Sequence, residues 1–338
     1  NPDPEVQNKF KEVTAAYDTL SDPQKRQSYD MGGSGFGGSF PNPFGNRGPG
    51  KRRVSPLTIT AVVLFILGSI LVSSSGFYAD LLWFRSVNFT KVWSTILITK
   101  IELFIVFGLA TSLVITSNIF IAYKKRPIYV PLTVEADNLE RYRAQIEPIR
   151  KLSIIGIAVA LFYFAGSAGT RLWEIWILFK NSTAFGVKDP QFNMDISFFA
   201  FKLPFWQAII GWASSTLVLS LIATTIVHYL YSGIRPQVRE DRTTVAARVQ
   251  LSVLLGVLVL VKAVAYWFDR YALALKDGKL ITGLTYTDVN AVLPAKAILT
   301  GIAIVCALLF FANIVRRSWV LPAAGTALLV ISSVLIAG

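Results

Sequence analysis

The chain has 338 residues, of which 53% are hydrophobic and only 16% are charged, which is too apolar for an ordinary soluble domain. Its net charge of +13 could indicate nucleic-acid binding, but the Lys and Arg residues cluster beside apolar runs, so no nucleic-acid partner is expected. The single cysteine, Cys306, and the single histidine, His228, exclude an internal disulfide and leave almost no material for metal sites or for Ser–His catalysis. We therefore expect no enzyme, no cofactor and no metal.

The first 50 residues are polar and patterned differently from the rest. Residues 4–20 place Phe10, Val13, Tyr17 and Leu20 at helical spacing, which predicts an amphipathic helix. A second short helix is expected from Pro23 to about residue 30, because proline suits the first position of a helix. Residues 31–50 contain eight glycines and are expected to form a flexible linker.

Long apolar runs follow, and each is long enough to cross a hydrocarbon core of about 30 Å as a helix. Their backbone groups would have no water to bind, so they must be helical. The sequence predicts an all-α, multi-pass membrane domain over residues 51–338. Its seven spans are expected at about 56–77, 96–123, 152–178, 204–232, 250–268, 294–315 and 318–338.

The basic residues predict the orientation of these spans. If the N-terminus is cytoplasmic, the inner segments hold 17 Lys and Arg residues and the outer segments hold 9. This bias favours a cytoplasmic N-terminus and an outward C-terminus in the cell (inner or plasma) membrane. The lipid bilayer is thus the first expected partner.

Seven of the eight tryptophans fall at or near predicted outer ends: Trp83, Trp93, Trp173, Trp176, Trp206, Trp212 and Trp267. An aromatic belt would explain them, but a belt is two-sided and this distribution is not. Our hypothesis is that the outer loops form an aromatic layer that supports an extracytoplasmic domain beyond residue 338. Because Asn1 begins within a motif and the last residues are apolar, we expect the natural protein to extend further at both ends.

Charged residues inside the spans are candidates for function. Lys262 lies within LVLVKAVAYW, where a charge needs a partner or access to water. Glu102 and Glu174 are its expected partners, and Lys100 and Arg171 complete a possible cluster. The cluster would serve an ion or proton pathway, or else a structural ion pair or a snorkelling lysine. Arg171 and Glu174, three residues apart, are also expected to pair along one helix face.

The loops offer weaker candidates. Asp189 and Asp195 could bind a cation with backbone carbonyls, but we prefer the interpretation as an ordinary Asp-Pro turn. Asp288 is expected to cap the segment that leads to the sixth span, and His228 to anchor a helix end at the interface. Gly166, Gly169, Gly256 and Gly301 are expected to allow close helix packing. No clear internal repeat is visible.

Residues 1–50 resemble the second half of a J-domain followed by its Gly/Phe-rich segment. The resemblance rests on NPDPEVQNKFKEVTAAYDTLSDPQKRQSYD, a partial J-domain over 1–30, and on GGSGFGGSF in the linker. J-domain proteins stimulate Hsp70 through a His-Pro-Asp motif, which would lie upstream of Asn1. The resemblance therefore implies Hsp70 as a partner only if the parent protein has a complete J-domain. A natural fusion or a joining error between DNA segments would both produce this junction.

Residues 51–338 resemble the N-terminal membrane region of an actinobacterial group, the uncharacterised protein family 0182. The stretches that carry this are FYADLLWFRSVNFTKVW, FGVKDPQFNMDISFFAFKLPF, VLLGVLVLVKAVAYWFDRY, YTDVNAVLPAKAILT and FFANIVRRSW. The resemblance implies seven spans followed by a large extracytoplasmic domain, and implies no reaction.

These observations favour a non-enzymatic membrane platform for an extracytoplasmic domain of the cell envelope. A transporter or channel that uses the Lys262 cluster is the first alternative. A membrane-tethered co-chaperone of Hsp70 is the second.

Overall fold

The computed structural model describes residues 56–127, 147–236, 242–277, 282–316 and 320–337, together with 13–14, 16–17, 20–21, 143 and 145. Within these residues it contains helices, turns and isolated β-bridges but no β-strand, which confirms the all-α prediction. The chain divides into two compact units, residues 1–76 and 77–338. The predicted linker and the predicted helix after Pro23 lie outside the described residues.

Little of the first unit is described. Val13, Tyr17 and Leu20 are helical, and all three side chains are exposed. An amphipathic helix buries such residues only when a partner surface is present. The helix α3, Pro56–Ser86, begins in this unit and ends in the second.

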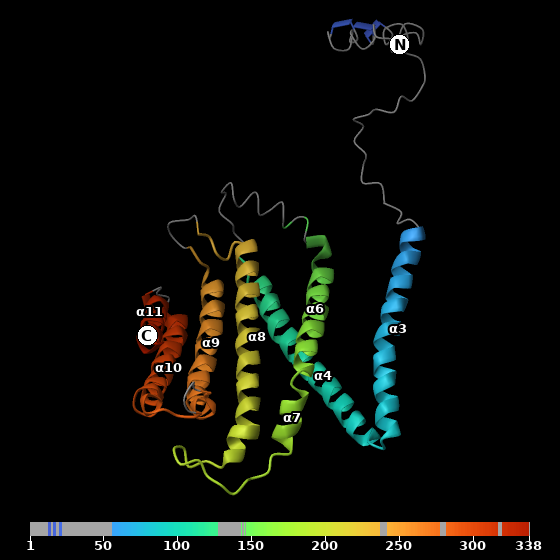
Figure 1. Ribbon diagram of the computed structural model, residues 1–338. Coiled ribbons are helices and arrows are strands. Elements are labelled where there is room, and N and C mark those ends of the chain that lie inside the picture. The colour runs from blue at the N-terminus through green and yellow to red at the C-terminus, as the bar shows by residue number, and fades with distance from the viewer. Residues whose placement is uncertain are drawn as a thin grey trace. The chain divides into compact units, whose positions relative to one another are not determined.

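The second unit is a bundle of long helices joined by loops (Figure 1). The helices in chain order are α4 (Thr90–Lys124), α6 (Arg150–Thr170), α7 (Trp173–Lys180), α8 (Leu203–Leu230), α9 (Val245–Ala272), α10 (Leu293–Arg316) and α11 (Val320–Ala337). Short 3-10 or π segments precede or follow some of them: η1 (Glu147–Ile149), η2 (Phe198–Lys202), η3 (Leu273–Leu275) and η4 (Asp288–Val292).

Six segments of the described chain are long and apolar enough to cross a membrane. They correspond to the first six predicted spans. The seventh predicted span coincides with α11, which has 18 residues and is not among the six. The total of seven and the orientation stay predictions.

The third predicted span, 152–178, is wrong as a single helix. The chain forms α6, which ends at Thr170, and then the separate helix α7, which begins at Trp173. Arg171 and Leu172 form the turn between them. Small and polar residues precede the turn and Arg171 lies within it, but apolar runs flank it on both sides, so the prediction joined them into one span.

The helices pack mainly against their neighbours in sequence. α9 lies between α8 and α10, while α4 crosses both α6 and α8 (Figure 1). α7 contacts α4 and α8 near the end of the bundle at which α8 begins. We call this end, with the loops 181–197 and 273–288, the aromatic end.

The crossing of α4 and α6 is very close. At three glycines an added Cβ would lie 2.6–2.8 Å from a phenylalanine of the facing helix, which no side chain can tolerate without movement. The three approaches are Gly108 on Phe162, Gly166 on Phe104 and Gly169 on Phe107. Membrane helices associate through such close contacts because burial from lipid supplies no hydrophobic driving force.

The glycine predictions are confirmed at three positions and wrong at one. Gly166 and Gly169 pack as just described, and a Cβ on Gly256 would lie 2.8 Å from Phe311 on α10. Gly301, by contrast, is exposed and has no atom within 4 Å of its Cβ position. Gly108, which packs on Phe162, was not among the predicted glycines.

α8 and α10 begin in the same unusual way. Each is preceded by a five-residue π-helical segment and begins with a Leu-Pro pair, Leu203-Pro204 and Leu293-Pro294. Proline lacks an N–H and clashes with the carbonyl four residues earlier, and a π turn relieves both problems.

We predict that Gly108→Ala destabilises the bundle by about 1–3 kcal/mol, the usual cost of overpacking. The nearest atom to the added Cβ is the backbone oxygen of Phe162 at 2.6 Å, which cannot move independently of α6. The measurement is the thermal unfolding midpoint of the purified protein in detergent.

Gly301→Ala is the matched control, because the added methyl group meets nothing and alanine favours the helix. Its midpoint should stay the same or rise slightly. Equal midpoints for the two variants would contradict the proposed role of the α4–α6 crossing.

Candidate functional site: the aromatic end of the bundle

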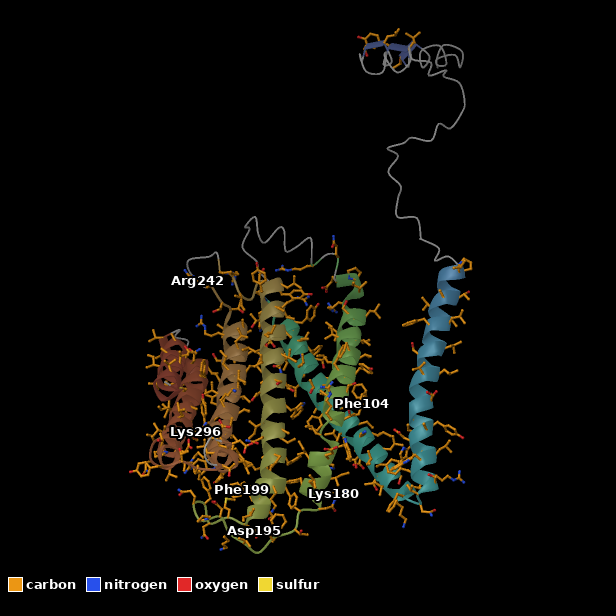
Figure 2. The ribbon with its side chains drawn as sticks, viewed as in Figure 1. Phe104, Lys180, Asp195, Phe199, Arg242 and Lys296 are labelled. Carbon is orange, nitrogen blue, oxygen red and sulfur yellow. The ribbon has the colours of Figure 1, made fainter. Side chains whose placement is uncertain are left out.

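Asp195 organises the loop between α7 and α8. Its carboxylate accepts hydrogen bonds from the backbone N–H groups of Phe185 (3.1 Å), Gly186 (2.9 Å) and Ser197 (2.9 Å). The first two lie nine and ten residues earlier, so this carboxylate closes the loop on itself. Figure 2 shows Asp195 at the same end of the bundle as Lys180 and Phe199, away from Arg242.

Asp189 fixes the tip of the same loop. Its Oδ1 accepts from the N–H groups of Gln191 and Phe192, both at 3.2 Å, which is an Asx turn. Asn193, which has a φ of 53°, then reverses the direction of the chain. The carboxylates of Asp189 and Asp195 are thus engaged by loop amides, and the geometry is that of a structural turn.

The loop between α9 and α10 is fixed in a similar way. Asp288 is buried, accepts from the N–H (3.0 Å) and hydroxyl (2.7 Å) of Thr285, and pairs with Lys276 at 3.1 Å. The N–H of Asp288 donates in return to the Thr285 hydroxyl at 3.2 Å. This reciprocal pair is a capping box, and it confirms that Asp288 caps the segment leading to the sixth span.

Aromatic rings connect the loop between α7 and α8 to the helix ends through Phe192. We define the aromatic layer as nine residues in continuous ring contact, with neighbouring centroids 4.0–6.4 Å apart. They are Trp176, Phe179, Phe192, Phe198, Phe199, Phe205, Trp206, Phe268 and Tyr271. The sequence predicted an aromatic layer from tryptophan alone, whereas seven of the nine members are Phe or Tyr.

The intramembrane charges predicted as a cluster are dispersed over three helices and a turn. Lys100 is half-buried on α4, with Nζ 5.2 Å from the centre of the Trp173 ring. Glu102 is exposed on α4 and lines an apolar cavity. Lys262 is exposed on α9, and within the described residues no ion pair joins it to either glutamate. The transport function built on Lys262 stays a prediction.

The proposed pairing of Arg171 and Glu174 along one helix is wrong. Arg171 is the C-cap of α6, while Glu174 lies in the first turn of α7, so the two do not share a helix face. Both are exposed. Glu174 is instead well placed for the helix dipole of α7, since the N-terminal turn favours negative charge.

A polar network that the sequence did not reveal lies at the opposite end of the bundle. Glu147 accepts from the hydroxyls of Tyr123 (2.9 Å) and Tyr231 (3.3 Å) and pairs with Arg150. Arg126 lies 4.0 Å from the centre of the Tyr123 ring. The position of Tyr231 just after α8, and of Glu147 just before α6, depends on tertiary packing, so spacing along the chain gives no signal.

His228 does not anchor a helix end at the interface, which corrects the prediction. It is 1% exposed, and its Nε2 lies 3.0 Å from Oε1 of Gln250 on α9. Thr216, Ser220, Thr224 and His228 recur at every fourth position of α8, and all four are buried. In the sequence, this recurrence of polar residues at every fourth position indicated that one face of the helix is buried.

The side chains of the aromatic end are held in place by their contacts and form a rigid surface. Its carboxylates are held by backbone amides or by Lys276, and its rings pack on one another. Five large apolar side chains nevertheless remain 40–84% exposed on or beside the two loops: Phe185, Val187, Ile196, Leu275 and Tyr286. We call these five the loop face.

The six apolar helices and the ordered loops define a helical membrane protein. Residues 57–338 match the model of the uncharacterised protein family UPF0182, so the chain belongs to that family. Residues 1–30 match the DnaJ domain. Both resemblances predicted from the sequence are therefore confirmed.

Curated relatives carry the family name. The chain is 47% identical over 287 residues to a UPF0182 protein of Nocardioides and 45% identical over 293 residues to one of Streptomyces coelicolor. A relative in Frankia alni is 46% identical over 259 residues. These alignments cover 77–85% of this chain but only 25–29% of the relatives' length. No solved structure matches the chain significantly.

We predict that Asp195→Asn loosens the loop 185–197, because an amide cannot replace a charged acceptor of three N–H groups. Hydrogen–deuterium exchange at Phe185, Gly186 and Ser197 should accelerate roughly threefold to tenfold, the range expected for one net hydrogen bond. Asp277→Asn, the same change in the other loop, should leave this exchange unaltered. Acceleration by both variants would point to a general charge effect instead.

The effect should depend on pH. Hydrogen bonds from Ser197, followed by those from Phe185 and Gly186, lower the pKa of Asp195 from 3.8 to about 2. A lowered pKa stabilises the folded loop fully above the unfolded value and ceases to do so as pH falls toward the folded value. The difference in exchange between wild type and Asp195→Asn should be constant above about pH 4 and shrink toward pH 2. A difference that persists below pH 2 would refute this assignment.

Proposed function

We propose that the chain is the membrane-embedded part of a larger cell-envelope protein, and that the aromatic end is the platform on which the remainder of that protein rests. The loop face is the observation that supports this most directly. Large apolar side chains on fixed loops are typical of a surface that another protein segment covers. Tyr286, which is 84% exposed on a loop fixed by Asp288, is the clearest example.

The length of the relatives supports the same proposal. This chain spans 29% of the length of the UPF0182 proteins from Nocardioides and Streptomyces coelicolor. The remaining part of such a relative is either held by the membrane region or tethered flexibly beside it. The hydrogen bonds of Asp195 and Asp288 fix described residues of both loops, and this favours a seated domain, because flexible tethering needs no fixed surface.

The proposed function is non-enzymatic. At the aromatic end the carboxylates are committed to loop amides and to Lys276, and no side chain there presents a nucleophile beside a base among the described residues. The proposed location is the plasma membrane with a cytoplasmic N-terminus, which rests on the bias of 17 to 9 basic residues. The aromatic end then faces the outside of the cell, where the remaining domain would lie.

The test is site-specific photocrosslinking in the full-length protein in native membranes. A photoreactive amino acid replaces Tyr286 or, separately, Val187 on the loop face. We expect crosslinked peptides that join these positions to the remainder of the same polypeptide, since a seated domain covers them. The control position is Val218 on α8, which is 41% exposed within a span and should crosslink to lipid.

Crosslinks from both loop positions to lipid alone would refute the platform. Crosslinks to a different polypeptide would also refute the proposal that the occupant is the protein's own domain. Tyr286 and Val187 lie on different loops, so a folding defect in one variant leaves the other informative.

A further inference from the structure

An apolar cavity of about 370 Å³ lies between α4, α7 and α8. Phe107, Trp176 and Trp212 are among its aromatic walls, and Val106 and Ile209 are part of its aliphatic lining. This volume is within the range of small-molecule sites, which begins at about 300 Å³. Every helix that lines it belongs to the second unit, so its geometry is internal to that unit.

The turn at Arg171 and Leu172 accounts for the cavity. α4 packs closely on α6 through its glycines, but the chain then turns and α7 begins as a separate helix that contacts both α4 and α8. A hydrogen bond and a ring contact hold the aromatic walls of the cavity in place. Trp212 donates from its indole N–H to the Thr111 hydroxyl at 2.9 Å, and its ring lies 5.1 Å from that of Phe107.

The cavity opens on the lipid-facing side of the bundle. Val106, on its edge, is 60% exposed, and α4 and α8 are both candidate spans. In a bilayer such an opening meets hydrocarbon and not water. A hydrocarbon chain is therefore the occupant that an apolar lining of this kind favours.

Glu102 is the one charged residue in the lining. No ion pair or hydrogen bond of its side chain is present within the described residues. Lys100 does not neutralise it, because it faces the Trp173 ring and residues two positions apart do not share a helix face. A carboxylate inside a span usually marks a functional site and needs a counter-charge.

Positive charge lies close by for a second group of the ligand. Lys100 is 5.2 Å from the Trp173 ring centre, and exposed Arg171 is two residues before Trp173 in the chain. Trp173 is one turn of α7 from Trp176, which lines the cavity. A ligand that carries an anion and a cation near the end of an apolar chain matches these charges.

We propose that this cavity binds one acyl chain of an amine-bearing phospholipid of the phosphatidylethanolamine class. The acyl chain fills the space between Phe107, Trp176 and Trp212. The primary amine pairs with Glu102, and the phosphate lies toward Lys100 and Arg171. The site is separate from the loop face, so it does not depend on the platform.

The test uses the chain reconstituted in phosphatidylglycerol nanodiscs that contain a trace of photoreactive lipid. The probes are phosphatidylethanolamine and phosphatidylcholine with the same diazirine-bearing acyl chain. We expect the ethanolamine probe to label the peptides around Val106, Trp176 and Ile209. It should do so roughly twofold to fivefold more than the choline probe, as one partly solvated ion pair allows.

Two variants separate the chain from the headgroup. Ile209→Trp fills the cavity and should abolish labelling by both probes. Glu102→Gln should leave acyl-chain labelling in place but remove the preference for ethanolamine over choline. Val218→Trp, on a lipid-facing position of α8, is the control for added bulk and should change neither result.

Equal labelling by the two probes in the wild-type protein would overturn the proposal of an amine-bearing lipid. Labelling spread evenly over the lipid-facing helices, or unchanged by Ile209→Trp, would overturn the acyl-chain site itself. Val106→Trp provides a second way to fill the cavity if Ile209→Trp does not fold, and it must give the same loss.

Discussion

A hydrocarbon solvent offers backbone N–H and C=O groups no partner, and the architecture of this protein follows from that constraint. Each apolar run becomes a helix that satisfies its own backbone. The same solvent removes the usual reason for helices to associate, because lipid is as apolar as the helix surface. Association then depends on close contact and on polar groups that seek partners.

Close contacts and polar contacts between helices both occur in the second unit. Glycines let α4 and α6 approach until phenylalanine rings and backbone atoms touch. Polar groups add to this: Ser112 on α4 donates to the carbonyl oxygen of Ala158 on α6 at 2.9 Å, and Asn313 on α10 donates to the hydroxyl of Ser252 on α9 at 2.9 Å. Where α7 turns away from this close packing, the bundle contains the cavity beside Glu102.

The two ends of the bundle use charge differently. At the aromatic end, carboxylates hold loops in shape by accepting N–H groups, and this leaves apolar side chains exposed on a fixed surface. At the other end, Arg126 and Arg150 stack on Tyr123, and the hydroxyls of Tyr123 and Tyr231 both donate to Glu147.

The sequence by itself determined the helical class, the approximate spans, the family and the capping role of Asp288. Each of these depends on composition or on residues a few positions apart, so local pattern is sufficient. Only the tertiary structure decided that the run 152–178 breaks at Arg171, because one charged residue between apolar runs does not by itself distinguish a turn from a continuous helix. The tertiary structure also showed that Gly166 packs against a facing helix while Gly301 does not. It placed Glu102 at a cavity instead of beside Lys262. Those outcomes depend on which helix faces which, and that is fixed by contacts between residues tens to more than a hundred positions apart.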